Sequence, residues 1–165
     1  MTPKYIVVHH SLTEDRQVVD WLAIKRYHTS WRYKGEIITE ADAHKMIGQG
    51  VRGVEAPWRD IGYHAGIEVV NGTYQILMGR MWDVPGAHCP EQGMNGMSLG
   101  FCCIGDYDLG PPPPEQWKLA VRLTKYACSI YKIPISNVYG HGEWSHTKTC
   151  PGTQFDMNEF RKNLS

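Results

Sequence analysis

The chain has 165 residues, a length that suits one domain with one hydrophobic core, which we place over 1–165. Its 17 basic and 17 acidic side chains cancel, so no net field attracts it to nucleic acid or to an anionic membrane, and neither is expected as a partner. The longest apolar runs are strand-sized and fall far short of the ~20 residues that a membrane-spanning helix requires.

The N-terminal part of the chain predicts one strand and two helices. Residues 4–9 read KYIVVH, a β-branched and aromatic run that favours a buried strand ending in histidine. Apolar side chains recur at helical spacing over 14–31, which predicts a helix with Thr13 as its cap. The following stretch, 33–58, contains several glycines and no clear alternation, and it predicts only a short helix over 40–47.

The middle of the chain predicts a β-hairpin and a long loop. Two strand-like runs within 62–79 are joined by Asn71-Gly72, a dipeptide typical of tight hairpin turns. Residues 80–97 are rich in glycine and proline and predict a loop, and loops of this length in compact domains are usually functional. The run SLGFCCIG predicts the next strand, over 98–105.

The C-terminal part predicts a long helix, a short strand and a last helix. Four prolines at 111–114 introduce a helix that runs to Lys132, with its apolar side chains on one face. NVYGH predicts a short strand at 137–141, and 155–163 can form the last helix. Strands interspersed with helices, including one hairpin, indicate an α/β domain with a central mixed β-sheet flanked by helices.

Neither the first residues nor the cysteines indicate a secreted protein. The sequence passes from MTPK directly into IVVHH without the pattern of a signal peptide, so we expect the chain to be cytoplasmic at synthesis. Its five cysteines are an odd number, which does not favour a disulfide framework in a chain of this length. At least one thiol is therefore free or a metal ligand.

A dense set of metal-ligating side chains lies near the C-terminus. The run GHGEWSHTKTCPG offers imidazole, carboxylate and thiol groups, namely His141, Glu143, His146 and Cys150. Catalytic zinc sites use three such ligands and leave a fourth position for water, whereas zinc fingers need paired short spacings that this run lacks. Each of these residues taken singly is more often a packed or surface side chain, so the prediction depends on the whole set.

A further ligand is predicted from the His9-His10 pair at the end of the first strand. Successive side chains of a strand point to opposite faces, so the two histidines cannot both reach one metal ion from a regular strand. One of them is therefore structural or holds a ligand in place.

Four motifs, in order along most of the chain, resemble the zinc amidases that include phage lysozymes of the amidase type and animal peptidoglycan-recognition proteins. YIVVHHS is similar to the first strand of that family, and DIGYHAGI to its central strand pair. HCPEQGMNGMSLGFCCIGDYD is similar to a substrate-contacting loop with its following strand, and GHGEWSHTKTCPG to the terminal metal loop. The last motif is the most specific, because its His, Lys and Cys are followed by Pro-Gly at the family's spacing.

This resemblance implies a ligand set, an activity and a partner. His9, His141 and Cys150 would bind one Zn²⁺, with Tyr63 and Lys148 as catalytic residues and with His64, His88 and Asn95 in contact with substrate. The implied reaction is hydrolysis of the amide between N-acetylmuramic acid and L-alanine in bacterial peptidoglycan or its muropeptides, by a monomeric enzyme. The lack of a signal-peptide pattern fits a phage or prophage endolysin that acts on the cell wall after release.

The implied chemistry gives Lys148 and Tyr63 distinct tasks. Coordination to zinc lowers the pKa of water toward ~7 and polarises a carbonyl. Negative charge then develops on the amide oxygen, and Lys148 is a cation that can hold it. The Tyr63 phenol can orient the attacking water or donate to the same oxygen, and the sequence allows both roles.

Several other polar side chains have two interpretations. His10 and His64 can be core histidines bonded to the backbone or can line the cleft. Glu143 can orient a ligand imidazole, although a loop-stabilising or solvent-facing role is favoured. His146 stands where the family often has proline, and its role is open. The remaining cysteines, at 89, 102, 103 and 128, are interpreted as packing residues.

Two other functions compete with that of an amidase. Members of the same family that lack a metal ligand recognise peptidoglycan without cutting it, and the presence of Cys150 distinguishes this chain from them. A regulatory role through binding to another protein is the third hypothesis, and the sequence offers no interface that supports it.

Overall fold

A five-stranded mixed sheet forms the centre of the protein, in a computed structural model that describes residues 1–13, 21–145 and 147–165. The strand order is β6-β5-β7-β1-β8; the edge pair β5 and β6 is antiparallel and the other pairs are parallel. The strands are β1 (Tyr5–His10), β5 (Ala65–Val70), β6 (Thr73–Met78), β7 (Ser98–Cys103) and β8 (Val138–Gly140). The predicted α/β fold with a central mixed sheet is confirmed.

The two central strands, β1 and β7, are buried on both faces. They pair in parallel from Tyr5 with Ser98 to His10 with Cys103. All six residues of β7 are buried, as is every residue of β1 after Tyr5. Uninterrupted apolar and β-branched runs are typical of parallel strands that are covered on both sides, and both runs were predicted as strands.

Strands β5 and β6 form the predicted hairpin. Their pairing continues to Val70 and Thr73, which leaves Asn71-Gly72 as a two-residue turn. The backbone φ is 51° at Asn71 and 80° at Gly72, the left-handed region that a type I′ turn requires at both positions. The hairpin therefore follows directly from these two residues.

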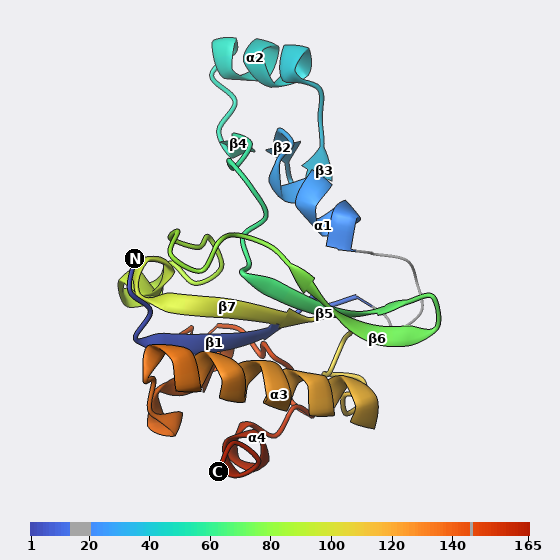
Figure 1. Ribbon diagram of the computed structural model, residues 1–165. Coiled ribbons are helices and arrows are strands. Elements are labelled where there is room, and N and C mark those ends of the chain that lie inside the picture. Colours follow the sequence, from blue (N-terminus) through green and yellow to red (C-terminus); the bar gives the residue numbers. More distant parts are fainter. Residues whose placement is uncertain (14–20, 146) are drawn as a thin grey trace.

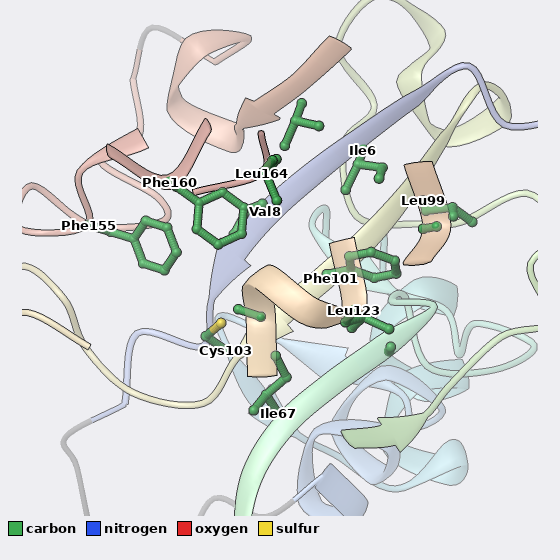
Figure 2. Close-up of a cluster of buried hydrophobic side chains, with 14 of the residues drawn as sticks. Ile6, Val8, Ile67, Leu99, Phe101, Cys103, Leu123, Phe155, Phe160 and Leu164 are labelled. Atoms are coloured by element: carbon green, nitrogen blue, oxygen red, sulfur yellow. The ribbon is translucent and has the colours of Figure 1, made fainter. Parts of the chain in front are cut away.

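One face of the sheet is covered by the long helix α3 (Pro114–Tyr131), with α4 (Met157–Lys162) beyond it (Figure 1). As predicted, α3 begins at the proline run; it ends before Lys132, whose φ is 57°. The core under α3 is built from alternate residues of the central strands and from C-terminal aromatics, among them Ile6, Val8, Leu99, Phe101, Phe155 and Phe160 (Figure 2). None of the described helices is both long and apolar enough to cross a bilayer.

The opposite side of the sheet carries α1 (Trp21–His28), as Figure 1 shows. This is the described part of the helix predicted over 14–31; it ends at His28, and the predicted contact of the Thr13 cap involves residues outside the described part of the chain. The Trp21 ring packs so closely over Gly66 of β5 that a Cβ atom there would collide with it. Helix α1 is thus seated directly on the sheet.

Residues 32–58 form a projecting segment beyond α1 (Figure 1), and this part differs from the prediction. The predicted helix is present as α2 (Glu40–Gly48), where Oγ1 of Thr39 accepts a hydrogen bond from the N–H of Asp42 at 3.1 Å. A second sheet, of order β3-β2-β4, was not predicted; it consists of β2 (Arg32–Tyr33), β3 (Glu36–Ile37) and β4 (Val54–Glu55). Strands of two residues are too short to show an alternating pattern.

Arg32 anchors the projecting segment to α1. Its buried guanidinium donates to the carbonyls of Tyr27 and His28 at 2.9 and 3.1 Å and pairs with Glu55 at 3.1 Å. It also lies 5.0 and 4.9 Å from the ring centroids of Tyr27 and Trp58, within the range of cation–π attraction. A buried cation therefore holds the segment in place.

Candidate metal centre

Strand β1 places His9 and His10 on opposite faces of the sheet, as strand geometry predicts. His10 lies on the α3 side, where its ring centroid is 5.9 Å from that of Tyr107 and its Nδ1 accepts a hydrogen bond from the N–H of Tyr107 at 3.1 Å. His9 lies on the other face, with its ring centroid 4.6 Å from that of His141. Of the two interpretations of His10, the structure supports the core histidine.

The other two predicted ligands belong to the loop that follows β8. A 3-10 turn, η3 (His141–Glu143), begins directly after the strand, and the N–H of Gly142 donates to the carbonyl of Cys150 at 2.5 Å. Glu143 stabilises the same turn, because its Oε2 accepts the N–H at the end of β8 at 2.6 Å and pairs with Arg161 at 3.0 Å. Of the two roles favoured for Glu143, the structure supports the loop-stabilising one.

His9, His141 and Cys150 converge on one point. One ligand atom from each lies within 4.8 Å of the other two, and Nδ1 of His9 is 3.6 Å from Sγ of Cys150. In a tetrahedral zinc site a nitrogen ligand at 2.0–2.1 Å and a sulfur ligand at 2.3 Å stand about 3.6 Å apart. Both the donor set and this spacing fit one zinc ion.

Burial keeps the two imidazoles in the form that binds a metal. Desolvation by burial, followed by the positive potential of His88, lowers the pKa of His9 well below its ordinary value. Burial and the charge of Lys148 likewise lower the pKa of His141. Both rings are therefore neutral near pH 7, as coordination requires. Burial raises the pKa of the Cys150 thiol to about 12, and a coordinating cation opposes this by stabilising the thiolate.

His88 lies behind His9, and Asn95 holds it there. Nδ1 of His88 is 3.0 Å from Nε2 of His9, and both rings are buried. Oδ1 of Asn95 accepts the backbone N–H groups of His88 and Cys89 at 2.7 and 2.8 Å. The ring of His88 also packs against Gly100, where a Cβ atom would collide with it. The structure thus places His88 next to His9 and Asn95 next to His88, and the contact of both with substrate stays a prediction.

His64 was also predicted to contact substrate, but it is fully buried. Its Nε2 is 3.0 Å from the carbonyl oxygen of Val84, and its Nδ1 accepts the N–H of Gly100 at 2.9 Å. Both ring nitrogens are therefore occupied by backbone groups, and the side chain joins the 80–97 loop to β7. Of the two interpretations of His64, the structure favours the core histidine over contact with substrate.

Tyr63 and Lys148 border the three predicted ligands. The ring centroid of Tyr63 is 5.1 Å from that of His9. Burial raises the pKa of this phenol well above its ordinary value, so it remains a proton donor at neutral pH. Lys148 is exposed, and its charge acts on both His9 and His141. A neutral donor and a cation thus lie beside the ligand set.

Glu91 and Cys89 belong to the same centre, although neither was predicted as a site residue. Oε2 of Glu91 lies 3.3 Å from Nε2 of His141 and 3.3 Å from Sγ of Cys89. Burial raises the pKa of the Glu91 carboxyl, but hydrogen bonds from its own N–H, from Cys89 and from His141 outweigh burial and lower this pKa to about 2. The signal available in the sequence was a carboxylate three residues after His88, within a loop already predicted to be functional.

The cysteines outside the centre behave as packing residues. All five cysteines, each within the described part of the chain, are unpaired thiols. Cys102 and Cys103 are buried in β7, and Cys128 is half-buried on α3, as predicted. His146 lies outside the described residues.

A cleft of about 460 Å³ opens beside Tyr63. It is bordered by α1 and by the projecting segment, and its lining includes Ser11, Ile24, Arg26, Tyr27, Ile37 and Tyr63. The volume lies within the range of sites that bind small ligands, and a mostly apolar lining with a few polar groups is typical of such sites. The shared residue Tyr63 connects this cleft with the predicted metal ligands.

The sequence is similar to proteins that are named for peptidoglycan. A family profile described as N-acetylmuramoyl-L-alanine amidase matches residues 1–153. Peptidoglycan-recognition protein LB of Drosophila melanogaster is 35% identical over 100 residues, which cover 60% of this chain and 40% of that protein. Peptidoglycan-recognition protein SC2 of Drosophila simulans is 33% identical over 105 residues, which cover 63% of this chain and 53% of that protein. The matched region thus spans about half of these relatives or less.

Solved structures of an endolysin amidase and of a peptidoglycan-recognition protein have the same fold. The endolysin N-acetylmuramoyl-L-alanine amidase LysCS from Clostridium intestinale URNW superposes with a TM-score of 0.68 at 22% identity, over 99% of this chain and 84% of that chain. Wild-type Drosophila PGRP-LB superposes with a TM-score of 0.61 at 26% identity, over 93% of this chain and 78% of that chain. Since the family profile covers nearly the whole sequence and the fold agrees, the chain belongs to the N-acetylmuramoyl-L-alanine amidase family.

Proposed function

We propose that this chain hydrolyses the amide between N-acetylmuramic acid and L-alanine in peptidoglycan, as a monomer, with one zinc ion held by His9, His141 and Cys150. The observation that carries the proposal is the convergence of these three ligand atoms within 4.8 Å in a member of this family. When bound, zinc lowers the pKa of water toward ~7 and polarises the amide carbonyl.

Two side chains next to the ligands are suited to the negative charge that develops on the amide oxygen. The Tyr63 phenol stays protonated, because burial raises its pKa well above the ordinary value. A protonated phenol is a hydrogen-bond donor, and the amide oxygen of a substrate is an acceptor for it. Lys148 adds a positive charge close enough to lower the pKa of His9. Preorganised donors of this kind stabilise the transition state more than the substrate.

The cleft beside Tyr63 is proposed to hold the substrate against this centre. Its apolar wall is formed by α1 and by Ile37 of the projecting segment, and Arg26 adds a cation to the lining. A peptide carries backbone groups and carboxylates, and a guanidinium binds carboxylates through two parallel hydrogen bonds. The cleft is therefore suited to a stem peptide whose scissile end lies next to Tyr63.

We further propose an endolysin role, in which the enzyme is made in the cytoplasm and acts on the cell wall after release. Two facts support this role: the family to which the chain belongs, and the likeness of its fold to that of the endolysin LysCS.

Recognition of peptidoglycan without cleavage is the second candidate function. It is favoured by the similarity to peptidoglycan-recognition proteins, at 33–35% identity. The complete set of three candidate ligands supports the enzyme over this alternative, because recognition alone does not require them.

Digestion of purified peptidoglycan separates the two candidates. The intact chain supplied with zinc is expected to release new L-alanine amino termini and no new reducing ends, and a chelator should stop the reaction until zinc is restored. Binding to peptidoglycan with neither product would support the recognition module and contradict the enzyme. New reducing ends would instead indicate cleavage of the glycan strand.

A further inference from the structure

Glu91 contacts the ring nitrogen of His141 in a largely shielded environment. The Oε2 to Nε2 distance is 3.3 Å, and the thiol of Cys89 donates to the same carboxylate oxygen at 3.3 Å. The side chain of His141 is 5% exposed and that of Glu91 is 25% exposed. Contacts to a charged group are weakened less by water and salt at such a site than on an open surface.

The loop that carries Glu91 also reaches the second histidine ligand. His88 lies 3.0 Å from Nε2 of His9, and Asn95 bonds the N–H groups of His88 and Cys89. One segment, 88–95, therefore touches a ring nitrogen of both predicted histidine ligands. This segment comes from the loop before β7 and is separate from the terminal loop that supplies His141 and Cys150.

A histidine that binds a metal through one nitrogen carries a proton on the other. An acceptor on that proton fixes the tautomer and the plane of the ring, and a carboxylate acceptor also makes the ring a better ligand. Glu91 offers such an acceptor to His141. Within the described residues, the other carboxylate within 4 Å of a histidine ring nitrogen is Asp106, which lies 3.9 Å from Nδ1 of His10 on the opposite face of the sheet.

We propose that Glu91 is a positioning residue of the metal centre: it accepts the Nε2 proton of His141 and so leaves Nδ1 of that ring to bind the metal. His88 has the corresponding role for His9, through its contact with Nε2 of that ring. The terminal loop thus supplies ligands, and the 88–95 segment orients them. This inference rests on the proposed zinc-dependent function.

The test compares Glu91→Ala and Glu91→Gln with a control, Glu36→Gln, at an exposed position of β3. Zinc affinity of the intact chain, measured by competition with a chromophoric chelator, is expected to fall about 10–100-fold in Glu91→Ala, the usual cost of losing such a partner. Glu91→Gln keeps an acceptor oxygen without the charge, so its affinity should fall between that of Glu91→Ala and the parent. The control should equal the parent.

A second measurement separates orientation of the ring from a merely structural role. The ¹⁵N chemical shifts of the His141 ring in the metal-free chain should show the proton on Nε2 in the parent and a mixture of tautomers in Glu91→Ala. A structural role alone would lower the unfolding temperature without changing the tautomer.

Three results would overturn the inference. Unchanged zinc affinity and tautomer in Glu91→Ala would do so while leaving the proposed function intact. Two zinc ions per chain, one of them lost in Cys89→Ala, would also do so, because Cys89, Glu91 and His141 lie close enough together to hold an ion themselves. A parent chain that binds no zinc would contradict both this inference and the proposed function.

Discussion

Nδ1 of His9 lies 3.6 Å from Sγ of Cys150, although 141 positions separate the two residues in the chain. The register of two neighbouring strands brings them together. β1 and β8 pair in parallel up to Val8 and Gly140, so His9 and His141 follow the last pair side by side. The N–H of Gly142 donates a hydrogen bond to the carbonyl of Cys150, and this bond holds Cys150 next to His141.

Cys150→Ser is expected to lose the one zinc ion that each chain is proposed to bind, because a serine hydroxyl stays protonated near pH 7 and is a poor zinc ligand. Turnover on peptidoglycan should fall by at least the ~10²–10³ that loss of one charge-stabilising donor costs. Cys128→Ser, on α3 and outside the centre, is the matched control. Zinc content by elemental analysis and release of L-alanine termini provide the two readouts. Full activity in Cys150→Ser would show that the ligand assignment is wrong.

Tyr63→Phe removes the phenol next to His9 and keeps its ring. If the phenol donates to the amide oxygen in the transition state, kcat should fall ~10²–10³-fold while KM and zinc content change little. Tyr126→Phe, at an exposed position of α3, is the control. A rise in KM with unchanged kcat would instead mean that Tyr63 contributes only to binding of the substrate.

The strands next to the predicted metal ligands were predictable because local sequence patterns determine them. The apolar run at β1 predicted the strand. It also predicted that His9 and His10 lie on opposite faces of the sheet, since side chains alternate along any regular strand. Asn71-Gly72 gave the hairpin, because few other dipeptides adopt positive φ at both positions.

Contacts between distant loops were not predictable in the same way. Glu91 and His141 are separated by 50 positions, and no periodicity links two irregular segments. The role of His64 depended on which backbone groups would face its ring, which is decided only when the 80–97 loop packs on β7. The small sheet at 32–58 was missed because it is held by Arg32 and by tertiary contacts more than by strand propensity.

The metal-free chain is expected to lose stability in mild acid through His64. Burial lowers the pKa of this ring from 6.5 to about 4 in the folded state. Between these values the unfolded chain binds the proton and the folded chain does not, so the stabilisation is present above pH 6.5 and is lost as the pH falls to 4. The expected loss from this side chain is roughly 3 kcal/mol.

Urea unfolding of the metal-free chain at pH 7 and pH 4 measures this loss. His64→Gln has no ionisable ring, so its free energy of unfolding should depend less steeply on pH, although it will be lower at pH 7. An equal pH dependence in parent and variant would mean that His64 is not the group that titrates.

Gly100→Ala is expected to disturb the proposed metal centre through His88, which contacts His9. A Cβ atom at this position would collide with the imidazole of His88, which is buried and cannot move into solvent. Overpacking of this kind costs about 1–3 kcal/mol of unfolding free energy. Displacement of His88 also removes the contact that it makes with Nε2 of His9 at 3.0 Å, so zinc affinity should fall together with stability.

Gly110→Ala is the matched control for Gly100→Ala, because a Cβ atom at Gly110 would meet no other atom within 4 Å. Urea unfolding and chelator competition should both leave Gly110→Ala equal to the parent. If Gly100→Ala lost stability but kept full zinc affinity, His9 would not depend on His88 for its orientation. That result would leave Glu91 and His141 as the pair through which the 88–95 segment acts on the metal centre.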